Sequence, residues 1–287
     1  MGSRSFDHRH FGRAVLERRA RTVSVCVPTL DEAPSIERTL APLVALRDDG
    51  LVDQVAVVDS GSADATRELA ARAGAEVHRA GALMPETGAL LGKGDALWRA
   101  LGVLHGDVVC FVDADSEDFG EHFVTGLVGP LLEVPGVQFA KGSYRRPFRL
   151  GERVLPEGGG RVTELTARPL LNSFYPELAV FAQPLAGEIA ADRELLFQLP
   201  FDCDYGVEIG MLIDVWTRVG LQGMAEVDLG TRQNRHRELS ELTPMAATVL
   251  QSVMARLQAE GRLTGRTSGV RVVQRPPMAA QPARGAA

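Results

Sequence analysis

The sequence predicts an α/β protein built on a mainly parallel, doubly wound sheet. Short apolar segments typical of strands alternate with helical segments through the first half of the 287 residues. Helical crossovers between successive strands make those strands parallel. Polar residues follow several strands at the point where they end, and ligands of such sheets bind beyond the carboxyl ends of the strands. We therefore expect a mainly parallel sheet with one binding crevice along that edge.

The first half contains the clearest elements. Residues 22–30 are β-branched and apolar and predict a strand that ends near Pro28, because proline is tolerated at the end of a strand rather than in its centre. Ser35 is expected to cap a helix that runs to about Arg47. The other elements expected here are strands at 54–59, 75–79 and within 107–116, and helices at 65–72 and 95–105.

The second half is less regular. A strand is expected at 137–144, and the loop at 149–160 is either a lid over a site or surface decoration. The remaining elements expected are a helix at 205–219, a strand at 222–229 and a helix at 239–260. Residues 261–287 are rich in Pro, Ala, Arg and Gly, a composition typical of disordered tails.

Composition narrows the class of protein. The formal charge of −6 argues mildly against a general nucleic-acid binder. No apolar run is long enough to span a bilayer, and residues 1–21 are polar rather than signal-like. Cys26, Cys110 and Cys203 lack the spacing of a metal site, which favours free thiols in a reducing compartment. A cytoplasmic location is expected.

Asp113-Ala-Asp115 ends an apolar strand with two carboxylates. Residues two apart on a strand point to the same face, so both acids are expected to face the crevice and to repel each other unless a cation lies between them. Mg²⁺ or Mn²⁺ suits such oxygen ligands, commonly together with substrate phosphates. The alternative is a solvated strand end with two surface acids.

Four further signals have both functional and ordinary interpretations. Lys93, between two glycines at the start of a helix, suits a phosphate but could be a surface lysine. The glycine-rich run 158–164 either binds a phosphate or carboxylate, or is a flexible linker with a helix cap. Glu188 and Glu208 could bind sugar hydroxyls or form structural ion pairs. The basic run 232–237 either supplies positive charge beside a bound diphosphate or is a charged strand end exposed to solvent.

As an ordered set, these segments resemble the glucosyl-3-phosphoglycerate synthases and their mannosyl-transferring relatives, glycosyltransferase family 81. The resemblance covers roughly residues 22–250. It rests on VPTLDE (27–32), VVDSGSAD (57–64), GKGDALWRAL (92–101), FVDADS (111–116), YRRP (144–147), GGGRVTELTARPLL (158–171), QPLAGE (183–188) and YGVEIGMLID (205–214).

The resemblance implies a GT-A fold and a retaining, metal-dependent transfer of a hexose. The donor would be a nucleoside-diphosphate sugar, with UDP-glucose favoured and GDP-mannose as the alternative. The acceptor would be the 2-hydroxyl of 3-phosphoglycerate, and the cofactor Mg²⁺, with Mn²⁺ as an alternative. A homodimer is expected, and the helix at 239–260 could serve it or pack on its own domain. The organisation expected is an N-terminal extension (1–21), one catalytic domain (22–260, with a nucleotide-sugar half to 116 and an acceptor half from 117) and a disordered tail (261–287).

The resemblance also implies roles for single residues. The donor would be bound by Pro28, Thr29, Leu30, Glu32, Ser60, Lys93, Asp113, Ala114, Asp115 and Glu208. The acceptor would be bound by Gly160, Arg161, Val162, Thr163, Arg232 and Asn234. Leu185 would lie close to the reacting carbon, so that Asp115, Leu185 and Glu208 form the expected catalytic set.

One departure from the family concerns the metal ligands. The family has its metal-binding histidine in an Arg-x-His-Arg-Asn-Arg run, whereas this chain reads RQNRHR at 232–237. An ungapped match places Asn234 at the histidine position, and in an extended segment His236 shares its face. We expect His236 to join Asp113 and Asp115 as a metal ligand, with Asn234 as the alternative.

The mechanism expected is attack on the same face as the departing diphosphate, because the sequence offers no second acid like that of a retaining hydrolase. A nucleotidyltransferase is a rival, but Pro28 to Glu32 lacks a glycine-rich triphosphate loop. A non-catalytic sugar-nucleotide-binding protein is the rival from another class. It would bind the donor without releasing nucleoside diphosphate.

Overall fold

The computed structural model describes residues 4–116, 118–146, 148–150, 153–155, 160–232, 239–263 and 272–281. Over these ranges the main sheet has eight strands in the order β1-β11-β6-β9-β5-β2-β3-β4. The strands are β1 (Arg4–Asp7), β2 (Val23–Thr29), β3 (Gln54–Asp59), β4 (Glu76–Arg79), β5 (Val108–Phe111), β6 (Phe139–Arg145), β9 (Ile189–Asp192) and β11 (Met224–Thr231).

The direction of the strands fixes where the site can form. All neighbouring pairs in this sheet are parallel except those that include β9, which runs antiparallel to β5 and β6. The carboxyl ends of the parallel strands therefore share one edge, and the amino end of β9 lies at the same edge. The sheet is mainly parallel, as the sequence predicts, with one antiparallel strand that the sequence did not reveal.

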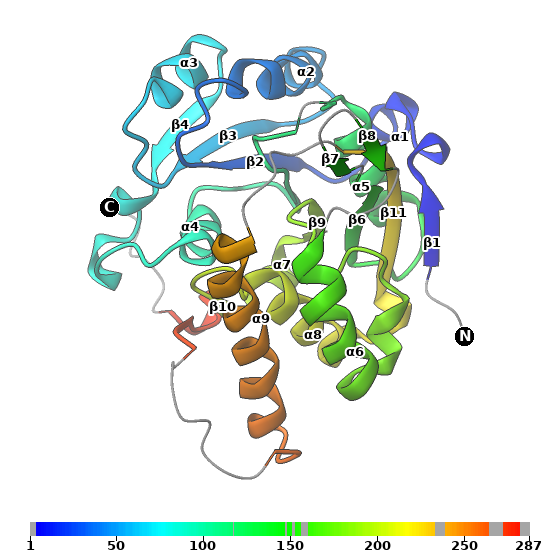
Figure 1. Ribbon diagram of the computed structural model, residues 1–287. Helices are drawn as coiled ribbons and strands as arrows, with labels where there is room; N and C mark the ends of the chain where they lie inside the picture. Colours follow the sequence, from blue (N-terminus) through cyan, green and yellow to red (C-terminus); the bar gives the residue numbers. More distant parts are fainter. Residues whose placement is uncertain are drawn as a thin grey trace.

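Helices cover both faces of the sheet. One core packs α1 (Arg13–Glu17), α2 (Ile36–Asp48), α3 (Thr66–Arg72) and α5 (His122–Glu133) against the strands. The other packs α4 (Lys93–Ala100), α6 (Arg168–Phe174), α7 (Arg193–Phe197), α8 (Val207–Val219) and α9 (Leu239–Ala259). Figure 1 shows α2 and α3 above β2 to β4, and α4, α8 and α9 below the sheet.

The two cores explain why the strands read as continuous apolar runs. In β2, Val25 and Val27 face one core and Cys26 the other, and β5 alternates in the same way. A strand buried on both faces needs apolar residues at every position. The three cysteines are free and buried, in agreement with the expectation from sequence.

Short elements complete the chain. The 3-10 turns are η1 (His8–His10), η2 (Ala80–Ala82), η3 (Pro85–Thr87), η5 (Pro176–Val180), η6 (Leu221–Gly223) and η7 (Met278–Ala280), and η4 (Thr163–Ala167) is a π-helical turn. Two small antiparallel pairs join β7 (Phe148–Leu150) to β8 (Arg153–Leu155) and β10 (Phe201–Asp202) to β12 (Gln274–Arg275). No helix in the described ranges has the length and apolar character needed to cross a bilayer.

Both ends of the chain differ from the sequence expectation. Residues 4–21 are more than an extension, because β1 pairs with β11 and Leu16 is fully buried (Figure 1). Without β1, β11 would be the edge strand of the sheet, and its unpaired backbone groups gain a partner in β1. The prediction of a disordered tail over 261–287 is wrong for β12, which pairs with β10, and for η7, which packs against α7 and buries Met278.

Candidate active site

Four adjacent strands bring charged side chains to one point of the sheet edge. Asp113 follows the end of β5, Glu188 precedes the start of β9, Tyr144 lies near the end of β6, and Arg232 follows β11. Because β9 is antiparallel, its first residue reaches the same edge at which its neighbours end. The expected crevice therefore gains a glutamate, Glu188, from an unexpected strand.

Arg232 is the centre of this cluster. Its side chain is 1% exposed, and its Nη2 lies 2.6 Å from Oδ1 of Asp115 and 3.4 Å from Oδ2 of Asp113. Its Nη1 forms an ion pair with Glu188 and donates a hydrogen bond of 2.9 Å to the Tyr144 hydroxyl. The two aspartates thus share one cation, and that cation is a side chain of this protein.

Lys93 is the second cation of the site. Its Nζ lies 2.9 Å from Oδ1 of Asp113 and 2.9 Å from Oε1 of Glu208. Lys93 begins α4, and Glu208 lies in the first turn of α8, where a negative charge also meets the positive end of the helix dipole. Two helices on the same face of the sheet therefore deliver a lysine and a glutamate to Asp113.

Burial and charge act against each other on these groups. Burial alone would raise the pKa of Asp113, but the nearby positive charges of Lys93 and Arg232 hold it well below its usual value. Burial raises the pKa of Glu188 despite the opposing charge of Arg232. For Arg232, burial lowers the pKa, yet Glu188 and the neighbouring acids keep it well above its usual value. The guanidinium and the Asp113 carboxylate are both charged in the folded protein.

Tyr144 and Arg146 connect this cluster to the start of the expected acceptor segment. The Tyr144 hydroxyl donates to Glu188 at 2.9 Å and accepts from Nη2 of Arg146 at 2.7 Å. Gly160 has a left-handed φ of 73°, and a side chain there would lie 3.8 Å from Arg146 and 3.7 Å from Thr163. The expected acceptor residue Gly160 therefore lies beside Arg146, which contacts Arg232 through the shared Tyr144 hydroxyl.

The segment that carries Leu185 packs tightly below the aspartates. A Cβ at Gly187 would lie 2.6 Å from the carboxylate of Asp113, so only glycine fits there. The buried Lys141 on β6 donates a hydrogen bond of 2.7 Å to the carbonyl of Ala186. Burial lowers the pKa of Lys141 to about 8. Leu185 is partly buried and packs against the hydrophobic core that includes α4 and α8.

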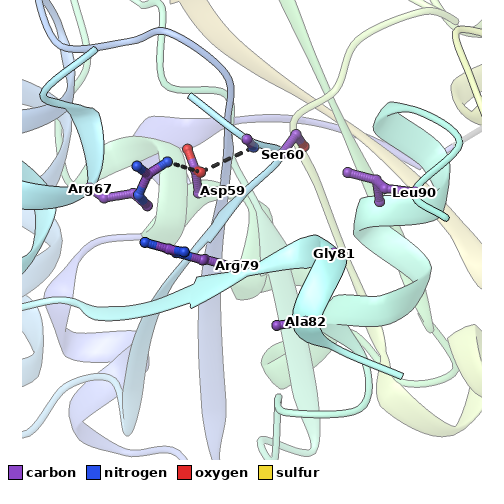
Figure 2. Close-up of a pocket in the computed structure, with 8 residues that line it drawn as sticks. Asp59, Ser60, Arg67, Arg79, Gly81, Ala82 and Leu90 are labelled. Carbon is purple, nitrogen blue, oxygen red and sulfur yellow. Dashed lines mark hydrogen bonds and ion pairs between the residues drawn. The ribbon is translucent and has the colours of Figure 1, made fainter. Parts of the chain in front are cut away.

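Ser60, which is expected beside the base of the donor, lines a pocket of about 420 Å³ at the ends of β3 and β4. Its lining residues are Asp59, Ser60, Gly61, Arg67, Arg79, Gly81, Ala82 and Leu90. Figure 2 shows Arg67 reaching Asp59, with Arg79 below them and Leu90 on the opposite wall. Leu90 belongs to the loop that leads to Lys93, so this loop connects the pocket to the charged cluster.

The other residues of the donor set hold the surrounding strand ends together. Thr29 accepts a backbone hydrogen bond from Ser60 at 2.8 Å, and the carbonyl of Ala114 accepts one from Thr39 at 3.0 Å. The Glu32 carboxylate accepts a hydrogen bond from Ser35. Pro28 lies within β2, paired with Val58, and Leu30 is 56% exposed.

The two alternatives for a third metal ligand, Asn234 and His236, lie outside the described residues. Within the described ranges, no group of three histidine, cysteine, aspartate or glutamate side chains is close enough to hold a metal ion. The electrostatic argument from sequence needs a correction, because Arg232 and Lys93 already supply the positive charge that Asp113 and Asp115 were expected to draw from a metal.

Three contributors escaped the sequence analysis. Tyr144 and Arg146 lie in a quoted motif, but no role was assigned to them, and Lys141 was not singled out. Lys141 could have been found from its place in the strand FAKGSYR, where its neighbours are apolar or small. A lysine in such a strand is expected to be buried, and buried lysines almost always have a hydrogen-bond or ion-pair partner.

Comparison with known proteins gives the family. The model described as "Glycosyl transferase family 2" matches residues 24–169. The chain belongs to glycosyl transferase family 2. Glucosyl-3-phosphoglycerate synthase from Mycolicibacterium smegmatis is 45% identical over 274 residues, covering 90% of this chain and 89% of that protein. The protein of the same name from Mycobacterium tuberculosis (strain H37Rv) is 48% identical over 242 residues, covering 82% of this chain and 74% of that protein.

Solved structures of this glycosyl transferase family agree with the fold. Mannosyl-3-phosphoglycerate synthase from Rubrobacter xylanophilus is similar with a TM-score of 0.88 and 43% identity, covering 96% of both chains. Glucosyl-3-phosphoglycerate synthase from Mycobacterium tuberculosis, in complex with Mn²⁺, UDP-glucose and phosphoglyceric acid, has a TM-score of 0.86 and 41% identity, covering 96% of this chain and 98% of that chain. The GT-A fold and the resemblance predicted from the sequence motifs are confirmed.

Proposed function

We propose that this chain is a retaining, metal-dependent glucosyltransferase that moves glucose from UDP-glucose to the 2-hydroxyl of 3-phosphoglycerate. The observation that carries the proposal is the convergence of Lys93, Asp113, Asp115 and Arg232 at one sheet edge, in a chain that shares 41% identity with a synthase solved with UDP-glucose and phosphoglyceric acid. These groups suit a diphosphate leaving group beside an anionic acceptor.

The donor would lie along the edge from β3 to β5. The pocket beside Ser60 is large enough for a pyrimidine base and faces the loop that leads to Lys93. Lys93 then meets the diphosphate, exchanging part of its contact with Asp113 for phosphate oxygens. Glu208, which is paired with Lys93, lies where the transferred sugar follows the diphosphate.

The residues present fit a divalent cation. Asp113 and Asp115 both approach one guanidinium nitrogen of Arg232, so their carboxylates can reach a single shared cation. Asp115, whose side chain is 40% exposed, is the more accessible of the two. Mg²⁺ or Mn²⁺ would be held by these carboxylates and the donor diphosphate, with His236 or Asn234 as a further ligand. Such an ion supplies Lewis-acid stabilisation of the leaving diphosphate.

The acceptor would bind between Arg232 and the Gly160–Thr163 segment. Arg161 and the amides that open the following helix suit its phosphate or carboxylate. Glu188 is fully buried and paired with Arg232, and Glu208 is paired with Lys93, so neither is poised as a nucleophile. This supports same-face attack, in which the leaving phosphate takes the proton of the acceptor hydroxyl near Leu185.

A donor screen tests the proposal. The purified chain is incubated with Mg²⁺, 3-phosphoglycerate and either UDP-glucose, GDP-glucose or GDP-mannose, and nucleoside diphosphate release and product mass are measured. Release with UDP-glucose that depends on acceptor is the expected result. Preference for GDP-mannose would instead make the chain a mannosyl-3-phosphoglycerate synthase, like the relative from Rubrobacter xylanophilus. Donor binding without release in all mixtures would leave only a sugar-nucleotide-binding protein.

Location and assembly belong to the same proposal. Three buried free thiols suit a reducing cytoplasm. A homodimer is proposed, and the exposed Leu250 on α9 offers apolar surface for it. Sedimentation of the purified chain distinguishes a dimer from a monomer.

A further inference from the structure

The loop before Lys93 is held by two arginines that the proposed chemistry does not use. Arg99 on α4 is fully buried and donates to the carbonyls of Leu83 at 2.7 Å and Gly88 at 2.7 Å. Arg275 on β12 donates to the carbonyl of Thr87 at 2.8 Å and to that of Ala89 at 3.3 Å. Residues 83–89 are thus fixed through their backbone, by side chains from two distant parts of the sequence.

Asp95 joins the two arginines. Its carboxylate is fully buried and accepts from Nε and Nη2 of Arg275 at 2.7 and 2.8 Å, and from Nε of Arg99 at 3.1 Å. It also accepts from the backbone of Leu91 at 2.9 Å. Paired hydrogen bonds between a guanidinium and a carboxylate fix orientation as well as charge. Asp95 lies two residues after Lys93, so this group braces the helix start that carries the diphosphate lysine.

The backbone around Lys93 touches the same C-terminal segment through β10. A Cβ at Gly92 would lie 2.8 Å from the carbonyl of Cys203, and one at Gly94 would lie 1.8 Å from that of Asp202. β10 in turn pairs with β12, and Trp98 of α4 donates to the carbonyl of Pro276 at 2.8 Å. The helix start is therefore enclosed by residues 201–203 and 272–278.

We propose that the C-terminal segment 272–281 acts as a brace for donor binding, and that Arg275 is a positioning residue that sets Lys93 and the 83–92 loop for the donor diphosphate. The inference rests on the proposed function, because it assigns the diphosphate to Lys93. Arg275 touches no reacting group itself. It acts through Asp95 and the loop carbonyls, and Leu90 in that loop also lines the pocket beside Ser60.

Kinetics of Arg275 variants test the inference. Arg275→Ala should lower kcat/KM for the donor by at least about tenfold, since a small displacement of a positioning group costs that much. The KM for 3-phosphoglycerate should stay within about twofold, because Arg275 acts through Asp95 and the carbonyls of the donor loop. Arg275→Lys keeps the charge beside Asp95 but loses the forked contacts, so it should recover thermal stability more than donor kinetics. Arg218→Ala, an exposed arginine that contacts Gln198, is the matched control.

Hydrogen exchange and fluorescence test the contact without any substrate. Amides of residues 83–92 should exchange faster in Arg275→Ala than in the Arg218→Ala control. The chain has two tryptophans, so in a Trp216→Phe background Trp98 alone reports on the brace, and its emission should shift to the red when Arg275 is replaced.

The outcomes separate the two proposals. Faster exchange together with a donor-specific kinetic loss supports the brace. Faster exchange with unchanged donor kinetics, or equal losses for donor and acceptor, overturns it and leaves Arg275 a purely structural residue. A wild-type chain that shows normal protection of residues 83–92 but transfers no sugar contradicts the proposed function instead.

Discussion

At the scale of residues, charges at the site are balanced by other residues of the chain. Arg232 is shared by three acids, and Lys93 by two. The sequence predicted Lys93, Asp113, Asp115, Glu208 and Arg232 as members of one site, because each lies in a recognisable motif. It did not predict which acid each cation would meet, because that depends on the antiparallel strand β9 and on helix packing.

Asp115 offers the first test at this scale. Asp115→Ala should reduce Mg²⁺-dependent transfer by about a hundredfold or more, because it removes an oxygen ligand and part of the leaving-group stabilisation. The fold should persist, because the buried Arg232 keeps its contacts with Glu188, Asp113 and Tyr144 when Asp115 is replaced. Nucleoside diphosphate release and thermal unfolding are measured beside Asp118→Ala, an exposed aspartate of the same loop. Full activity of Asp115→Ala in chelator would exclude the metal role.

Lys141 offers a second test. Its pKa falls from 10.5 to about 8 on folding, so the charged lysine is disfavoured in the folded state. Between pH 8 and 10.5 the folded protein gives up this proton before the unfolded chain does, so stability rises with pH in that window. Relative to Lys141→Met, the free energy of unfolding of the wild type should therefore improve by roughly 3 kcal/mol from pH 7 to pH 10.5. Parallel pH profiles for the two proteins, measured by urea unfolding, would contradict the buried charge.

At the scale of elements, the start of α4 was the least predictable part of the site. The sequence predicted a helix at 95–105, whereas α4 spans Lys93–Ala100. The Asp95 amide donates to the carbonyl of Cys203 rather than within a longer helix, which ties this helix start to β10. A contact with a residue more than a hundred positions away leaves no trace in local periodicity, so the expected boundary was two residues late.

Gly94 tests this element. Gly94→Ala would bring a Cβ to 1.8 Å from the carbonyl of Asp202, so either α4 or β10 must move. The free energy of unfolding should fall by about 2 kcal/mol or more, as for other overpacked sites. Gly12→Ala is the control, because a Cβ there meets nothing within 4 Å. Urea unfolding measures both variants, and equal stabilities would show that β10 is free to adjust.

At the scale of the whole molecule, the interior of the fold was predictable and its borders were not. Strands β2, β3 and β5 are buried on both faces, so their continuous apolar runs predicted them from the sequence. The edge strand β1 reads RSFD and the tail strand β12 has two residues, and neither carries a periodic signal. Both owe their structure to partners elsewhere in the chain, β11 and β10.

Phe11 tests whether the N-terminal residues belong to this fold. Its ring is 5% exposed and packs on α5, where a Cβ at Gly129 would lie 2.3 Å from the ring. Phe11→Ala should lower the free energy of unfolding by about 3 kcal/mol, the usual loss for a buried aromatic ring. His10→Ala, at an exposed neighbour, should leave it nearly unchanged. If both substitutions changed the free energy of unfolding only slightly, residues 1–21 would be an extension outside the fold, as the sequence predicted.

Arg232 has a consequence for how the protein is made. The positive charge that balances Asp115 and Glu188 is a side chain of the protein itself, so it is present as soon as the chain is synthesised. We therefore expect the chain to fold without a divalent ion, in contrast to small domains that fold only around a metal. A change in the cellular concentration of Mg²⁺ should then change the rate of sugar transfer and leave the amount of folded protein unchanged.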